Sequence, residues 1–128
     1  MSFSHPVLEE GYNIPMEILR SALSLNELRG KAAALFGDMV KAVVDVDREL
    51  LAVDAELHSD LEALLLENGS KQASLWGINL YPELKGSDFI EFDSMINVRP
   101  SQKNRSRDVL DPFIREKIAG IVEKKIRR

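Results

Sequence analysis

The chain has 128 residues, of which 45% are apolar, so it is long and apolar enough for one domain with a hydrophobic core. It has no cysteine, which excludes disulfide bonds and thiolate metal sites. Its formal net charge of −4 argues against strong, sequence-independent DNA binding, which depends on Lys and Arg side chains that neutralise phosphates. No segment has the roughly 20 apolar residues of a membrane span, and the first residues do not resemble a signal peptide. We therefore expect a cytoplasmic protein that makes no membrane contact.

The first elements follow a segment without periodic pattern. Residues 1–13 are expected to form a flexible tail in front of one domain at 14–128. The segment 16–22 favours a short strand, because a helix start signal follows it directly. In that signal Ser24 and Glu27 form a capping box, in which each side chain binds a backbone N–H of the first helical turn. A helix is therefore expected to begin here.

A hairpin is expected next. The β-branched residues of 39–46 predict a strand, and 50–57 predicts a second one. A two-residue loop at Arg48-Glu49 places Lys41 opposite Glu56, on the face away from the apolar residues. This register predicts a cross-strand ion pair between them.

The C-terminal half predicts two helices and two strands. Ser59 and Glu62 form a second capping box, so a helix is expected to begin at Ser59. The segments 74–81 and 88–98 predict strands, and Asp111 is the expected N-cap of a last helix that begins with proline. The order β-α-β-β-α-β-β-α predicts an α+β fold: a mostly antiparallel sheet of four or five strands with three helices on one face.

The opposite face of this sheet is expected to be polar. Alternation along the last strand points Glu91, Asp93 and Asn97 away from the apolar face. A plain solvent-facing sheet explains part of this pattern. However, Asp, Asn and His are disfavoured in strands, and apolar side chains such as Met95 and Tyr81 lie among them. Apolar groups around a few polar ones are typical of a ligand site or an interface.

A basic loop is expected beside this face. Residues 99–107, with the sequence RPSQKNRSR, contain four cations and no acid. The planar guanidinium of arginine suits phosphate, and asparagine and serine add hydrogen bonds. The segment therefore predicts a phosphate or nucleic-acid contact, although a solvated loop after the last strand is the alternative interpretation.

A metal site and an enzyme are the competing hypotheses. His58 could join Glu56, Asp60, Glu91 or Asp93 around a metal ion, but the chain has only two histidines, so we expect neither a metal nor a cofactor. Acid–base chemistry by His58 with Glu91 and Asp93 is the enzymatic alternative. The chain contains no P-loop, G-x-S-x-G, H-E-x-x-H or G-x-G-x-x-G motif.

We therefore expect a small binding or interaction module, with a hydrolase-like enzyme as the alternative. The sequence does not identify a partner. Self-association about a two-fold axis is one hypothesis, and a phosphorylated or nucleic-acid ligand is another, which the net charge does not support. The candidate binding residues are Lys41, Glu56, His58, Asn79, Glu91, Asp93, Asn97, Arg99, Asn104, Arg105 and Arg107.

Three segments carry a resemblance to a known family: ELHSDLEALLLENGS, LWGINLYP and IEFDSMINVRPSQKNRSR. From about residue 17 to 126 the chain resembles a small family of uncharacterised prokaryotic proteins, of the domain-of-unknown-function kind. The resemblance implies a free-standing single-domain protein. It implies no activity, substrate or catalytic residue.

Overall fold

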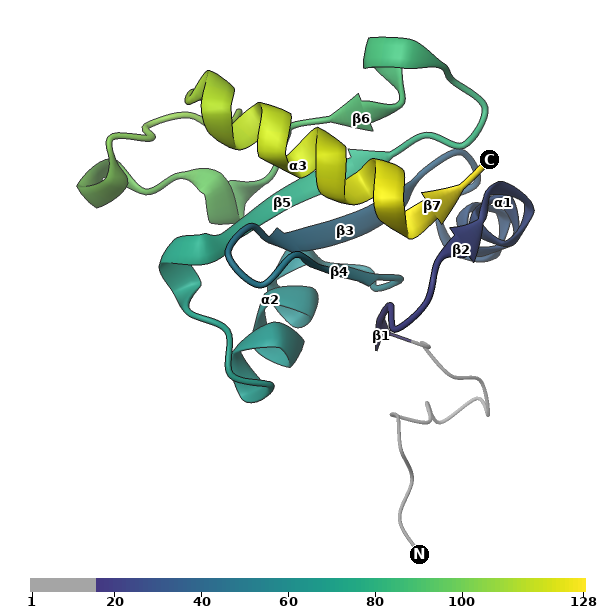
Figure 1. Ribbon diagram of the computed structural model, residues 1–128, viewed down its shortest axis with the longest axis horizontal. Helices are drawn as coiled ribbons and strands as arrows, with labels where there is room; N and C mark the ends of the chain where they lie inside the picture. The colour runs from purple at the N-terminus through teal and green to yellow at the C-terminus, as the bar shows by residue number, and fades with distance from the viewer. Residues whose placement is uncertain (1–15) are drawn as a thin grey trace, which may run out of the picture.

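The structure is a computed structural model that describes residues 16–128. Its main feature is a five-stranded sheet of order β1-β4-β3-β5-β6, in which every pairing is antiparallel (Figure 1). The strands are β1 (Glu17–Ile18), β3 (Val40–Asp45), β4 (Leu50–Val53), β5 (Leu75–Leu80) and β6 (Ile90–Glu91). A short parallel pair joins β2 (Leu23–Ser24) to β7 (Ile126–Arg127) near the C-terminal end.

Three helices complete the predicted α+β class, which is confirmed. They are α1 (Leu25–Leu35), α2 (His58–Glu67) and α3 (Pro112–Lys125). Short 3-10 helices lie in the connecting segments: η1 (Gln72–Ser74) before β5, η2 (Gly86–Asp88) between β5 and β6, and η3 (Met95–Asn97) and η4 (Pro100–Gln102) between β6 and α3. The capping box predicted for the first helix is present, with Ser24 Oγ accepting from the Glu27 N–H at 3.0 Å. Asp111 caps α3 as expected.

The helices are distributed differently from the expected arrangement on one face. In Figure 1, α3 runs across the front of the strands, and α3 packs in the same apolar cluster as Val44 and Leu51. The adjacent residues Val43 and Ala52 point the other way and pack against α2. Strands β3 and β5 are buried along nearly their whole length, so both faces of the sheet need a cover. A helix on each side supplies it.

The hairpin between β3 and β4 has another loop than the one predicted. Asp45 lies opposite Leu50, so the loop comprises the four residues 46–49. The Asp45 carboxylate holds this turn, because one of its oxygens accepts the backbone N–H groups of Asp47 at 3.0 Å and Arg48 at 2.9 Å. The predicted two-residue loop was wrong because the sequence pattern does not reveal this side-chain bond.

The predicted ion pair between Lys41 and Glu56 is consequently absent. The new register brings the Asp54 N–H to the carbonyl oxygen of Lys41, at 3.3 Å. Glu56 lies beyond the end of β4 and is exposed. The Lys41 ammonium instead lies 5.2 Å from the centre of the Phe36 ring.

Two further boundaries were predicted wrongly. The expected strand 88–98 ends after Glu91, and the chain then turns into η3, where Ser94 Oγ accepts the Ile96 N–H at 3.3 Å. The helix α2 begins at His58 instead of Ser59; its N-cap, Leu57, makes no side-chain bond. As a result, Asn97 lies in η3 and His58 lies in α2, and neither belongs to a strand.

Candidate functional site

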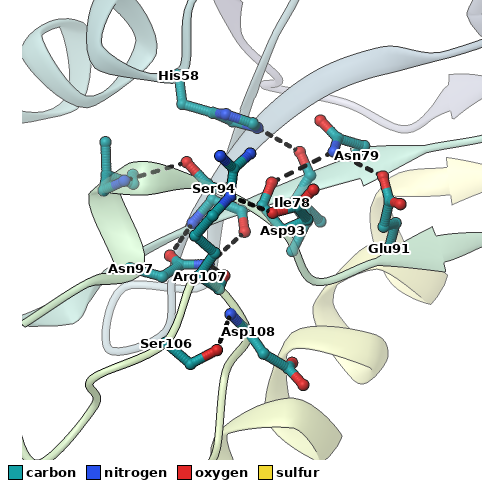
Figure 2. A network of polar contacts seen from close by, with 12 residues as sticks. His58, Ile78, Asn79, Glu91, Asp93, Ser94, Asn97, Ser106, Arg107 and Asp108 are labelled. Atoms are coloured by element: carbon teal, nitrogen blue, oxygen red, sulfur yellow. Dashed lines mark hydrogen bonds and ion pairs between the residues drawn. The ribbon is translucent and has the colours of Figure 1, made fainter.

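One end of the sheet face that α2 covers is polar. On this face, Asn79 of β5 lies opposite Lys41 of β3 on one side and opposite Glu91 of β6 on the other. His58, at the start of α2, lies beside them (Figure 2). We call the group of Lys41, His58, Asn79, Tyr81, Glu91 and Asp93 the polar face.

His58 is tied to the central strand. The residue is 8% exposed, and Nε2 lies 2.8 Å from the carbonyl oxygen of Ile78 (Figure 2). A carbonyl oxygen only accepts, so Nε2 carries the proton and donates it. Burial lowers the pKa of His58 to about 4, with help from Lys41 and against the effect of the Ile78 carbonyl, Asn79 and Asp93. The imidazole is therefore neutral at pH 7.

Gly77 makes the close approach of His58 possible. A Cβ atom at this position would lie 2.6 Å from both Cβ and Oγ of Ser94 and 3.2 Å from Cδ2 of His58. No side chain fits there without moving one of them. The two segments that follow β4 and β6 thus converge above one residue of β5 that lacks a side chain.

Side-chain hydrogen bonds join the end of β5 to Glu91 of the edge strand β6. Asn79 Nδ2 donates to Glu91 Oε1 at 2.9 Å, and the Tyr81 hydroxyl donates to the same oxygen at 2.9 Å. Burial and this bond to Glu91 raise the pKa of Tyr81 to about 12. The Oδ1 atom of Asn79 is buried and has no hydrogen-bond partner among residues 16–128. Glu91 is therefore held in place as an acceptor.

The polar face meets the basic loop at one ion pair. Arg107 Nε donates to Asp93 Oδ1 at 2.6 Å, and both side chains are about half exposed (Figure 2). Such an exposed pair contributes little to stability, on the order of 1 kcal/mol or less. It fixes the position of the guanidinium next to the polar face.

The loop itself is held by two buried asparagines. The Asn97 amide pairs with the backbone of Gly77 at 2.8 and 3.0 Å, in place of a neighbouring strand. Asn104 Nδ2 lies within 3.0 Å of the carbonyl oxygens of Asn97, Ser106 and Asp108, and its Oδ1 accepts the Leu110 N–H at 2.9 Å. These bonds give the segment a defined shape.

Nearly the whole described part of the chain matches a known family. A model of the family described as "Protein of unknown function (DUF5674)" matches residues 17–125. The chain belongs to this family. Searches of curated proteins and of solved structures find no match to this DUF5674 protein. The match confirms the resemblance to a domain-of-unknown-function family and assigns no activity.

The structure brings together part of the predicted set of site residues. Six of them lie on or beside the polar face: Lys41, His58, Asn79, Glu91, Asp93 and Arg107. Glu56 is exposed ahead of α2, and Arg105 is exposed on the basic loop. Asn97, Asn104 and Arg99 turn inward.

Arg99 shows how such a residue serves the fold. Its guanidinium donates to the carbonyl oxygens of Gln72 and Leu75 and lies 4.1 Å from the centre of the Trp76 ring. Burial lowers its pKa from the usual value. Arg99 therefore anchors the start of the basic loop to β5. These contacts account for the position of its guanidinium without a ligand.

Three residues of this region were missing from the predicted set: Tyr81, Gly77 and Ser94. Tyr81 was the detectable one, because it follows Asn79 by two positions, and alternation places both on one face. Ser94 and Gly77 meet through the turn after β6, which no local pattern announces. Their contact depends on tertiary structure.

Two hollows lie away from the polar face: one of about 850 Å³ between the β1–β2 segment, α1 and the end of α2, and one of about 160 Å³ between β6 and α3. In the part of the chain from residue 16 onward, no three His, Asp or Glu side chains gather as metal ligands would. No helix in that part is long and apolar enough to cross a membrane.

Proposed function

We propose that this DUF5674 protein is a cytoplasmic binding module for a phosphate-bearing ligand, which it contacts through the loop 99–107 and the adjoining edge of the polar face. The observation that carries the proposal is the built shape of this loop. The Asn104 side chain ties it together at four points, and Arg99 and Asn104 form an isolated antiparallel bridge across its base. A loop that is already ordered loses little entropy when a ligand binds.

The exposed cations support an anionic ligand. Lys103 and Arg105 are exposed, and neither has a carboxylate within 4 Å in the described range 16–128. Lys103 stands at the tip of the loop in a left-handed conformation, with φ of 62°. Arg107 adds a third cation, held by Asp93 at the border of the polar face. Charge-assisted hydrogen bonds from such groups are the usual means of binding phosphate.

A hydrolase-like enzyme on the same face is the alternative. It draws on the neutral imidazole of His58 beside Asp93. It has less support, because the Nε2–H of His58 is donated to the Ile78 carbonyl oxygen and the two hollows described above include neither His58 nor Asp93. A catalytic site normally encloses its substrate in a concave pocket.

The test compares two phosphate probes. Inorganic pyrophosphate is titrated by calorimetry, and a fluorescein-labelled single-stranded RNA by anisotropy, at two salt concentrations. The variant Arg105→Ala should weaken binding of the probe roughly tenfold, since it removes a charged hydrogen bond. Binding should also weaken as salt rises.

The matched control is Arg20→Ala, which removes the same charge from the exposed turn between β1 and β2. It should leave the affinity unchanged. If the wild-type protein binds neither probe, or if both variants lose affinity equally, the loop is not a phosphate contact. Preference for one probe tells a free polyphosphate from a nucleic acid.

A further inference from the structure

Opposite charges stand symmetrically about β5 on the polar face. Asn79 lies opposite Lys41 on one side and opposite Glu91 on the other, so two strand spacings, about 10 Å, separate the two charges. Across residues 16–128, Lys41 has no carboxylate within 4 Å, and Glu91 has no cation within the same distance. Each charge is available to a partner.

Two exposed apolar side chains lie next in the chain to residues of this region. Leu57, 57% exposed, precedes His58 at the start of α2, which packs against β3 and β4. Met95, 65% exposed, follows Ser94 and begins η3, which contacts both β5 and α2. Exposed apolar residues beside charged ones are typical of interfaces, and methionine is enriched there.

We propose that a second copy of this chain covers the polar face, about a two-fold axis that runs along β5 in the plane of the interface. This axis exchanges the two sides of β5. Lys41 of each copy then faces Glu91 of the other, and the exposed Met95 and Leu57 add apolar area next to these charges. A contact of this kind uses the same surface on both copies and closes at two.

The charge pattern is what selects a second copy among possible occupants. A different partner would need its own cation and anion at this spacing of about 10 Å. A second copy of the chain already has both, because Lys41 and Glu91 lie on either side of β5. The inference does not rest on the proposed phosphate ligand. The dimer would carry two copies of the loop 99–107, which a polyanion could contact together.

The test is a charge exchange on the full chain, followed by sedimentation velocity and light scattering over a range of concentrations. The wild-type protein should be a dimer. Lys41→Glu alone and Glu91→Lys alone should each weaken the dimer at least tenfold, because like charges then face each other. A mixture of the two variants should restore a heterodimer, in which each changed side chain meets the opposite charge.

An apolar anchor gives a second, fold-neutral readout. Met95→Glu should produce a folded monomer, because the side chain is exposed and its replacement disturbs no core contact; circular dichroism checks the fold. The matched control is Phe113→Glu, at a 79% exposed position at the start of α3 on the other side of the sheet, and it should stay dimeric. A wild-type protein that is monomeric up to its solubility limit overturns the proposal. So does a mixture that stays monomeric, or equal behaviour of Met95→Glu and Phe113→Glu.

Discussion

His58 donates its Nε2–H to the carbonyl oxygen of Ile78 across 2.8 Å, which fastens the first turn of α2 to the central strand of the sheet. The bond uses a neutral imidazole in a nearly dry position. It explains why α2 begins without a side-chain cap: the helix start is positioned by the sheet below it. This side chain therefore couples the stability of the fold to pH.

The first prediction concerns that coupling. The folded pKa of His58, about 4, lies below the ordinary histidine pKa of 6.5, so the unfolded chain binds the extra proton between these two pH values. The free energy of unfolding should therefore be highest above pH 6.5 and should fall as the pH drops toward 4. The loss attributable to His58 is roughly 3 kcal/mol, as about 1.4 kcal/mol corresponds to each pKa unit.

Urea unfolding at a series of pH values measures this effect. Carboxylates also titrate in the acid range, so the wild-type curve is compared with that of His58→Gln. The difference between the two curves should shrink steadily from pH 6.5 to 4. Parallel curves would show that His58 is not held neutral by the fold.

The second prediction concerns Gly77. Replacement by alanine should destabilise the protein by about 1–3 kcal/mol, because the new methyl group overlaps Ser94 and crowds His58. Thermal unfolding measures the change. Gly30→Ala is the matched control: Gly30 lies inside α1, where a new methyl group would meet no neighbouring segment within 4 Å, so alanine there should stabilise by up to about 1 kcal/mol. Similar effects at the two positions would refute the packing argument.

The third prediction concerns Asn104. Alanine at this position leaves the Leu110 N–H and three carbonyl oxygens without their partner, and the protein should lose about 2–4 kcal/mol of stability. In the Asn104→Ala variant, amide hydrogen exchange should become faster in the loop 99–107 than in the wild-type protein, while exchange in α2 changes less. Asn26→Ala, at an exposed position of α1, should change stability by less than about 0.5 kcal/mol. Unchanged exchange in the loop would show that Asn104 does not order it.

The sequence predicted secondary structure well where the interactions that determine it are local. The capping box of Ser24 and Glu27 is a bond between side chains and backbone three residues apart, so the pattern alone contains it. Asp111 before proline is a signal of the same kind. Alternation along β5 correctly turned Asn79 away from Ile78, because strand geometry needs no partner to set it.

The sequence does not reveal contacts between residues that are distant in the chain. Asn97 and Asn104 are candidate ligand contacts because they are polar and lie near a basic run; in the structure both are buried, and their side chains bind backbone groups. The hairpin register depends on the hydrogen bonds that the Asp45 carboxylate accepts from the backbone N–H groups of Asp47 and Arg48. Polarity in a sequence does not say whether a side chain meets water or a backbone group.

The sequence by itself thus determined the order along the chain of the three helices and of the strands of the five-stranded sheet, the starts of α1 and α3, and the direction of Asn79 on β5. These follow from bonds within a few residues and from the two-residue period of a strand. Tertiary structure alone decided that helices cover both faces, because β3 and β5 are apolar on each side. It also decided which polar side chains are buried: His58 and Asn79 are, whereas Glu91 is exposed, and the segment after β6 folds back over Gly77.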